Sequence, residues 1–235
     1  MKIAAIIPAY NEEKSIVAVI NSINELKDRL DITAIVINDC STDETSFIAS
    51  KTNCIVLNLP VNLGIGGAVQ TGFKYALQNN FDIAIQVDGD GQHPPEEIPR
   101  LIQPIINNEA DVVIGSRFIE KDGFQSSYIR RQGIKYFKLL NKFLVSVEVM
   151  DSTSGFRAIN RKALEVVDDY YPDEYPEPEA IILYAFNHLT IKEIPVKMRE
   201  RQGGVSSINS FSSIYYMIKV TLAIISTYVR LKPKK

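Results

Sequence analysis

The chain has 235 residues, of which 46% are hydrophobic and 23% are charged, and its formal net charge at pH 7 is −2. This length and composition suit one large α/β domain, or one domain with an appendage, around a sizeable buried core. The small negative charge argues against a nucleic-acid-binding protein, which usually carries a basic surplus. Cys40 and Cys54 lack the spacing of a zinc site, and Met1 and Lys2 lead directly into an apolar segment. We therefore expect reduced thiols and no signal peptide.

Short apolar segments, typical of buried strands, alternate with helical segments through the first half of the chain. The predicted strands are residues 2–7, 32–37, 54–57, 83–87 and 111–114. One helix, capped by Asn11, is expected to run to about residue 27, and a short helix is expected to be capped by Ser41 or Thr42. Two more helices are expected to end near residues 78 and 107. This alternation predicts an α/β fold with a doubly wound, mostly parallel central sheet flanked by helices.

Polar or conformationally special residues stand where the predicted strands end. They are Pro8, Asp39, Asp88, Asp90 and Arg117. In doubly wound sheets, ligands bind outside the C-terminal ends of the strands. We therefore expect one polar cleft to which four strands contribute.

The strand at 83–87 ends in Asp88-Gly89-Asp90-Gly91. Two carboxylates one residue apart suit a hard divalent cation such as Mg²⁺ or Mn²⁺, which keeps its other positions for phosphate and water. The glycines permit a tight turn and the close approach of a ligand. An Asp-Gly turn in a surface hairpin is the alternative. It is disfavoured because the helix start at 94–97 follows, and no second alternating strand does.

A glycine-rich segment, residues 64–67, precedes the helix that ends near residue 78. It has neither the spacing of a dinucleotide fingerprint nor the Gly-Lys-Ser/Thr of a Walker loop. Two interpretations stay open at this point. The glycines allow close packing of the helix on the sheet, or they bring the backbone against a ligand.

The second half of the chain is less regular. Residues 127–145 predict a basic amphipathic helix, whose cations face solvent or an anionic partner. Residues 151–157 are expected to form a polar loop that leads into a short strand. One helix is expected from residue 162 and another after residues 175–179, and residues 191–196 predict a further strand. Residues 199–207 are basic and contain glycine, which is typical of a loop that closes over phosphates.

Residues 208–230 predict a long amphipathic helix with one polar stripe. Its 23 residues reach roughly 34 Å, long enough to cross a bilayer. Lys219 near its middle weighs against crossing, because a central lysine costs about 3 kcal/mol on insertion scales. We expect the helix to lie in a membrane surface, where Arg230, Lys232, Lys234 and Lys235 attract anionic lipid. Packing against the domain itself is the alternative.

Seven motifs, in this order, resemble those of family 2 glycosyltransferases with the GT-A fold: PAYNEE, NDCSTDET, NLGIGGA, VDGDGQHPPEE, IGSRF, DSTSGFR and RERQGGVSS. The set is most similar to the dolichol- and polyprenyl-phosphate sugar synthases and covers about residues 2–207. The resemblance implies a GT-A catalytic domain at 1–207, followed by a membrane-docking helix and tail at 208–235. It implies metal-dependent, inverting transfer of a hexose from a UDP- or GDP-sugar to polyprenyl phosphate. The enzyme would be cytoplasmic and peripherally bound to the inner face of the cell membrane.

The resemblance also implies roles for individual residues. The nucleotide-sugar donor would contact Pro8, Ala9, Tyr10, Glu12, Ile37, Asp39, Gly67, Asp88, Gly89, Arg117 and Arg201. Asp88, Asp90 and Gln92 would hold Mg²⁺ or Mn²⁺, and Arg117 and Arg201 would face phosphates. The acceptor phosphate would contact Arg130, Arg131 and Ser207. Two residues depart from the family pattern: Asn38 replaces an aspartate, and Ser207 replaces a lysine, which weakens its assignment to the acceptor phosphate.

The acceptor decides whether a general base is needed. A lipid phosphate is already anionic and needs little help, whereas a sugar hydroxyl must lose a proton to a carboxylate. Glu179 is the first candidate for that base and Glu177 the second, unless both merely begin a helix. We interpret His93 as a turn residue, and Asp151 as ordering its loop or contacting Arg130 or Arg131. A non-catalytic nucleotide-sugar-binding module is a further alternative, disfavoured by the intact metal-site residues.

Overall fold

The computed structural model describes residues 1–120, 128–199 and 210–232. Its strands are β1 (Lys2–Ala9), β2 (Asp31–Asn38), β3 (Ile55–Asn58), β4 (Ile83–Gln86), β5 (Val112–Ser116), β6 (Arg157–Asn160) and β7 (Ile191–Pro195). Its helices are α1 (Ile16–Asn24), α2 (Thr45–Ser50), α3 (Gly64–Gln78), the 3₁₀ helix η1 (Pro95–Glu97), α4 (Ile98–Ile106), α5 (Tyr128–Val145), α6 (Arg161–Asp169), α7 (Pro176–Phe186) and α8 (Ser210–Leu231).

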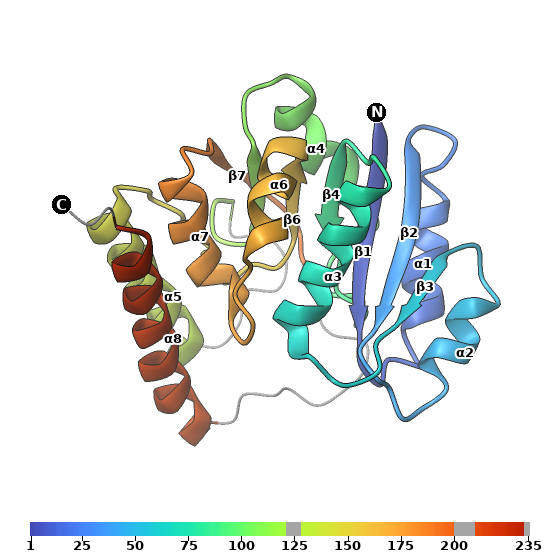
Figure 1. Cartoon of the computed structure of the whole chain (residues 1–235), viewed down its shortest axis with the longest axis horizontal. Coiled ribbons are helices and arrows are strands. Elements are labelled where there is room, and N and C mark those ends of the chain that lie inside the picture. Colours follow the sequence, from blue (N-terminus) through green and yellow to red (C-terminus); the bar gives the residue numbers. More distant parts are fainter. Residues whose placement is uncertain (121–127, 200–209, 233–235) are drawn as a thin grey trace.

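The seven strands form one sheet in the order β3-β2-β1-β4-β6-β5-β7 (Figure 1). The pairs β1–β2, β1–β4, β2–β3 and β5–β7 are parallel. β6 lies between β4 and β5 and is antiparallel to both. The predicted mostly parallel sheet is therefore confirmed. Because β6 runs the other way, its first residue, Arg157, lies at the edge where β4 and β5 end.

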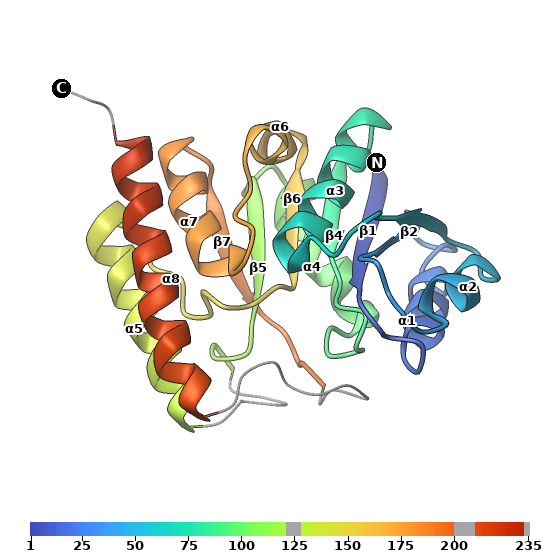
Figure 2. The same ribbon diagram turned by 60° about the horizontal axis from the view of Figure 1, so that its bottom comes forward.

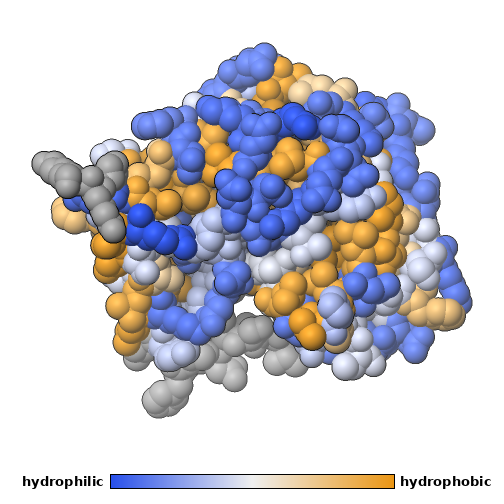
Figure 3. All heavy atoms as spheres, in the orientation of Figure 1, coloured by the Kyte–Doolittle hydropathy of each residue, from blue (hydrophilic) through white to orange (hydrophobic). Residues whose placement is uncertain are grey.

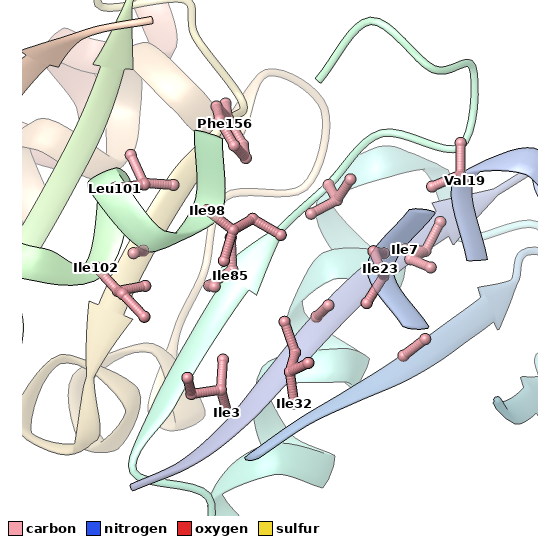
Figure 4. Close-up of a cluster of buried hydrophobic side chains, with 14 of the residues drawn as sticks. Ile3, Ile7, Val19, Ile23, Ile32, Ile85, Ile98, Leu101, Ile102 and Phe156 are labelled. Carbon is pink, nitrogen blue, oxygen red and sulfur yellow. The ribbon is translucent and has the colours of Figure 1, made fainter. Parts of the chain in front are cut away.

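Helices cover both faces of the sheet, which explains why the central strands read as continuous apolar runs. On one face, α1 packs on β2, and α4 packs on β5 and β6. Figure 4 shows part of this core, including Ile3, Ile7, Val19, Ile23, Ile32, Ile85, Ile98, Leu101, Ile102 and Phe156. On the other face, α3, α6 and α7 bury a second cluster that includes Phe73, Leu164 and Tyr184. The result is a three-layer α/β/α arrangement whose strand ends stay open for ligands.

The start of α1 differs from its prediction. Asn11 does not cap this helix, which begins at Ile16. Asn11 has a positive φ of 56°, and its Oδ1 accepts a hydrogen bond of 2.8 Å from the backbone N–H of Thr42. Asparagine tolerates this left-handed conformation better than most residues. The side chain thus ties the loop after β1 to the loop after β2, and both loops border the same edge of the sheet.

Two long helices, α5 and α8, lie side by side at one end of the molecule, next to α7 (Figure 2). Val220 and Ile224 of α8 are fully buried against Phe137 of α5 and Ile182 of α7. One face of α8 therefore packs on the domain, as the alternative interpretation proposed. Among the residues that the structure describes, no helix combines the length and the apolar character needed to cross a membrane.

Candidate active site

The loop after β4 presents the two aspartates identified from the sequence. Asp90 is only 2% exposed, and its Oδ1 accepts a hydrogen bond of 2.9 Å from the backbone N–H of Gln92. Gly91 has a φ of 78°, a conformation that glycine adopts without strain and that closes this turn. Asp88 is partly exposed and accepts a hydrogen bond of 3.3 Å from the side chain of Gln86. The turn thus holds two carboxylates at one strand end.

His93 is more than a turn residue, because it holds Asp88 in place. Its Nδ1 accepts a hydrogen bond of 3.0 Å from the backbone N–H of Asp88, and its Nε2 lies 3.5 Å from Asp88 Oδ2. The ring stacks on Phe156 with centroids 5.0 Å apart. Burial lowers the pKa of His93 from 6.5 to about 4, and the charge of Asp90 opposes this effect. The imidazole is therefore neutral at physiological pH, as an acceptor at Nδ1 requires.

The acidic turn fits a divalent metal that is shared with a substrate. Mg²⁺ and Mn²⁺ prefer oxygen ligands, and Mg²⁺ is usually bound by one or two carboxylates together with phosphates. Asp88, Asp90 and the Gln92 amide supply such oxygens. Within the described residues, no three histidine, cysteine or carboxylate side chains cluster into a metal site of their own. These oxygen ligands therefore suit a metal site that is completed by phosphate oxygens better than a metal site made by protein side chains alone.

The end of β1 lies against this turn. A Cβ atom on Gly89 would lie 3.2 Å from the carbonyl oxygen of Pro8, so the two segments are nearly in contact. Ala9 is buried in β1, whereas Tyr10 is half exposed beyond its end. Glu12 accepts a hydrogen bond of 2.9 Å from Ser15 Oγ. These residues, assigned to the nucleoside by resemblance, therefore border the edge that carries Asp88.

Asp39 follows β2 at the same edge. Its two carboxylate oxygens accept hydrogen bonds from the backbone N–H groups of Leu63 and Gly64, at 2.7 and 2.9 Å. The carboxylate thus binds the N-terminus of α3, where negative charge is favoured. Ile37 is buried within β2, so its side chain belongs to the core. Asn38, at the position of a family aspartate, donates a hydrogen bond of 2.8 Å to Asn58 on the neighbouring strand.

The glycine-rich start of α3 packs closely on the rest of the domain. A Cβ atom on Gly66 would lie 2.1 Å from the carbonyl oxygens of Pro172 and Asp173, and the Gly66 N–H donates a hydrogen bond of 2.8 Å to the latter. A Cβ atom on Gly67 would meet the side chain of Leu63 at 2.6 Å. Close packing therefore accounts for Gly66. Contact between Gly67 and the nucleotide-sugar donor stays a prediction.

Arg117 follows β5 and pairs with Asp151. Its Nε and Nη2 donate hydrogen bonds of 2.7 and 2.8 Å to the two oxygens of the buried carboxylate. Burial opposes the positive charge, but the hydrogen bond and charge of Asp151 outweigh it and raise the pKa of Arg117. Asp151 thus orders Arg117, a partner that the sequence analysis did not name. The backbone N–H of Asp151 in turn donates a hydrogen bond of 2.8 Å to Glu193 on β7.

Glu177 and Glu179 begin α7 but have different surroundings. Glu179 is buried, and its Oε1 accepts hydrogen bonds from Tyr170 at 2.8 Å and from Thr227 of α8 at 2.5 Å. This geometry gives Glu179 a structural role and does not support it as a general base. The surroundings of Glu177 show in its pKa. Burial raises the pKa of Glu177, and the charge of Arg157 opposes this effect.

Some predicted residues cannot be compared with the structure. Arg201, Ser207 and the side chain of Arg130 lie outside the described residues, and so do Lys234 and Lys235. Arg131 is exposed on α5. Conversely, the sequence analysis missed Gln86 and Arg157, which are both buried and pair with each other across the β4–β6 ladder. A charged or amide side chain inside an otherwise apolar strand was the available signal, because such residues are rarely buried without a specific partner.

The mixed sheet, with an acidic turn after β4 and Asp39 after β2, is the architecture of a GT-A glycosyltransferase. The family model described as "Glycosyl transferase family 2" matches residues 4–168, and the chain belongs to this family. A UDP-N-acetylglucosamine–dolichyl-phosphate N-acetylglucosaminyltransferase from Methanococcus voltae is 36% identical, over 82% of this chain and 83% of its own length. A polyprenol monophosphomannose synthase from Mycolicibacterium smegmatis is 28% identical, over 92% and 84%.

Solved structures support the fold. Glucosyl-3-phosphoglycerate synthase from Mycobacterium tuberculosis, in complex with Mn²⁺, UDP-glucose and phosphoglyceric acid, has a TM-score of 0.73 at 22% sequence identity. The match covers 97% of this chain and 79% of that one. At this identity the likeness concerns the fold. The family membership and the fold expected from the seven motifs are thus confirmed.

Proposed function

We propose that this enzyme transfers a hexose from a UDP- or GDP-sugar to polyprenyl phosphate at the cytosolic face of a membrane, for the assembly of cell-surface glycans. The observation that carries the proposal is the acidic turn at Asp88 and Asp90, held beside the β1 and β2 ends in a chain of this family. By their names, one relative described above is a dolichyl-phosphate N-acetylglucosaminyltransferase and the other is a synthase of polyprenol monophosphomannose. Both cover more than four fifths of the chain.

The reaction is a displacement at the anomeric carbon of the sugar. A phosphate oxygen of the acceptor forms the new bond on the face opposite the leaving group, the bond to the nucleoside diphosphate breaks, and the configuration inverts. A bound Mg²⁺ or Mn²⁺, held by Asp88, Asp90 and Gln92, would supply positive charge to the departing diphosphate. Arg117 would face the same charge, as would Arg201. Because Asp151 fixes the Arg117 guanidinium through two hydrogen bonds, little reorganisation is needed when charge develops.

The acceptor proposal rests on the surroundings of Glu179. A phosphate nucleophile needs no general base, and Glu179 is already engaged with Tyr170 and Thr227. The second candidate function, transfer to a saccharide hydroxyl, would need a base at the cleft. Glu177 is the group favoured for that role, since burial and the charge of Asp88 both raise its pKa. The acceptor phosphate would meet Arg130, Arg131 and Ser207.

Membrane docking is proposed for the outer faces of α5 and α8. Large apolar side chains are exposed on both helices: Leu139 and Phe143 on α5, and Tyr215, Ile218, Leu222, Ile225 and Val229 on α8. We call these seven residues the apolar face; Figure 3 shows apolar surface at the edge of the molecule where the helices lie. Arg230 and Lys232 lie at the end of α8, where they would attract anionic lipid. An apolar face bordered by cations is the pattern of a helix that lies in the membrane interface.

The direct test is a transfer assay with the full chain. Radiolabelled UDP- and GDP-hexoses are incubated with the protein, Mn²⁺ and vesicles containing polyprenyl phosphate, and the lipids are then extracted. We expect label from one nucleotide sugar in the lipid fraction, and none when the lipid phosphate is replaced by the free polyprenol. Label transferred to an added oligosaccharide, with none in the lipid, would establish the second candidate function instead.

A further inference from the structure

The side chain of His93 closes the acidic turn onto the end of β4. The backbone N–H of Val87 donates a hydrogen bond of 2.9 Å to the carbonyl oxygen of Ile6 on β1. Successive N–H groups of a strand point to opposite sides, so the N–H of Asp88 points away from β1 and towards β6. A buried N–H without an acceptor costs free energy. His93 supplies the acceptor, because its Nδ1 lies 3.0 Å from the Asp88 nitrogen.

Gly155 leaves room for the histidine ring at this place. The β4–β6 ladder ends at the pair of Gln86 and Arg157, and its register, continued by two residues, would put Gly155 opposite Asp88. A Cβ atom on Gly155 would already be in van der Waals contact with the ring, 3.4 Å from His93 Cε1. The ring of His93 therefore takes the position that a strand partner of Asp88 would otherwise occupy.

Packing fixes the ring in one orientation. His93 is buried, and its ring stacks on Phe156 with centroids 5.0 Å apart and planes inclined by 23°. The preceding residue is held as well, because the carbonyl oxygen of Gln92 accepts a hydrogen bond of 3.0 Å from the backbone N–H of Arg199. The acceptor atom Nδ1 thus has a defined place, and this place determines where the backbone of Asp88 lies.

The two ring nitrogens contribute differently to the position of Asp88. Because Nδ1 accepts a hydrogen bond, the ring proton is on Nε2. Nε2 lies 3.5 Å from Asp88 Oδ2, at the outer limit of a hydrogen bond. The other carboxylate oxygen, Oδ1, accepts a hydrogen bond of 3.3 Å from the side chain of Gln86. The contact at Nδ1 is the shortest of the three, and it alone acts on the backbone.

We propose that His93 is a positioning residue for the metal site. Through the hydrogen bond at Nδ1 it fixes the backbone of Asp88, and so sets the affinity of the acidic turn for a divalent cation shared with the donor diphosphate. This inference rests on the proposed function and adds a residue that acts through Asp88. Removing a group that orients a metal ligand typically lowers metal affinity by about 10–100-fold. A ring that only filled space would have no such effect.

Three replacements of His93 separate the hydrogen bond from the packing. In His93→Asn the new side-chain oxygen is as many bonds from Cα as Nδ1 is, so an acceptor remains while the ring stacked on Phe156 is lost. In His93→Gln the polar atoms lie as far from Cα as Nε2 does. His93→Leu keeps an apolar side chain and has no acceptor. His188→Asn, at an exposed histidine after α7, is the matched control.

The affinity for Mn²⁺ is measured with the full chain from the electron paramagnetic resonance signal of free Mn²⁺, in the presence of UDP or GDP. We expect His93→Leu and His93→Gln to lower this affinity by about 10–100-fold. His93→Asn should retain most of the affinity, and the control should retain all of it. A purely structural role predicts the opposite order, because His93→Leu keeps apolar contact with Phe156 that His93→Asn loses.

The outcomes distinguish failure of the inference from failure of the proposed function. Unchanged Mn²⁺ affinity in His93→Leu, or equal losses in His93→Leu and His93→Asn, would overturn the positioning role while leaving the metal site itself in place. If the unmodified protein binds no Mn²⁺ with either nucleotide, the metal site of the proposed function fails, and the inference fails with it. Thermal unfolding in chelator shows whether each variant is folded. His93→Gln, which also lacks an acceptor at the Nδ1 position, replaces His93→Leu in the comparison if the latter does not fold.

Discussion

Arg117 and Asp151 form a two-point ion pair in which the planar guanidinium meets both carboxylate oxygens, at 2.7 and 2.8 Å. The backbone N–H of Arg117 donates a third hydrogen bond to the same carboxylate, and Thr153 Oγ1 accepts one from Nη2. The pair joins the end of β5 to the loop before β6. Because Asp151 is fully buried, each charge depends on the other for its compensation.

Asp151→Ala should therefore destabilise the protein by about 3–5 kcal/mol, since it removes the buried carboxylate that binds two nitrogens of the Arg117 guanidinium. The free energy of unfolding in urea measures this loss. Glu120→Ala is the control, because Glu120 pairs with Arg100 at 3.5 Å on the surface. Exposed pairs contribute about 0–1 kcal/mol, so the control should remain near the unmodified value. Equal losses in the two variants would contradict the importance of the buried pair.

The sequence predicted the sheet and the acidic turn because both depend on local patterns. Apolar runs that end in polar residues define strands and their ends without knowledge of long-range contacts. The place of β6 could not be predicted, since a four-residue segment does not specify which strands it will join or in which direction. Its position in the sheet is what brings Arg157 opposite Gln86, two residues before Asp88.

Side-chain partners were harder to predict than strand ends. Glu177 and Glu179 are two residues apart, and on a helix that spacing separates their side chains by about 200°, so they face different surroundings. Which of them faces the strand-end edge depends on how α7 packs. Likewise, Asp151 could have met any nearby arginine. Its pairing with Arg117 follows from the adjacency of β5 and β6, which the sequence pattern does not contain.

Metal dependence is a second prediction. Asp90→Asn should abolish transfer, and so should a chelator, with activity restored by excess Mn²⁺ or Mg²⁺. Asp90→Ala should keep the fold, because Asp90 lies in the turn after β4 and not in an apolar cluster. Transfer is measured by lipid extraction, and the fold by circular dichroism. Full turnover of Asp90→Ala in the presence of chelator would contradict the metal assignment.

The structural role of Glu179 gives a third prediction. Glu179→Leu leaves the hydroxyl groups of Tyr170 and Thr227 without their acceptor, so we expect a loss of about 1–3 kcal/mol in unfolding free energy. Glu179→Gln should lower the transfer rate only modestly. A double-mutant cycle with Thr227→Val should show coupling, because the two side chains share one hydrogen bond. A fall in rate of three or more orders of magnitude with unchanged stability would instead identify Glu179 as a base.

The buried His93 predicts a pH dependence of stability. Its pKa is lowered from 6.5 to about 4 in the folded protein, which corresponds to about 3 kcal/mol. As the pH falls from about 6.5 to 4, the unfolded chain takes up a proton that the folded chain does not, so stability decreases over this window. Urea unfolding is measured in chelator at several pH values, for the unmodified protein and for His93→Gln. For His93→Gln, the free energy of unfolding should fall less steeply as the pH decreases from 6.5 to 4. An equal fall in the two proteins would contradict the prediction.

The apolar face on α5 and α8 provides the final prediction. Phe143 is 84% exposed and Leu222 is 61% exposed, so changing either to serine should not disturb the core. Each side chain should contribute about 1.5–3 kcal/mol when it enters lipid, so each substitution should weaken binding to anionic vesicles roughly tenfold or more. Phe47→Ser, at an exposed phenylalanine on α2, is the matched control and should bind as the unmodified protein does.

Two kinds of experiment distinguish membrane docking of the apolar face from self-association: changes of charge or salt in vesicle binding, and measurement of the oligomeric state. Arg230→Gln and Lys232→Gln should each reduce binding to anionic vesicles by about 1 kcal/mol, and added salt should weaken binding without abolishing it, because the apolar contribution remains. Self-association is the competing explanation for an exposed apolar surface. It predicts that Phe143→Ser and Leu222→Ser convert a dimer to a monomer in analytical ultracentrifugation, with no change in vesicle binding. A monomeric protein whose binding to vesicles depends on both residues would support docking, and a dimer with no affinity for vesicles would exclude it.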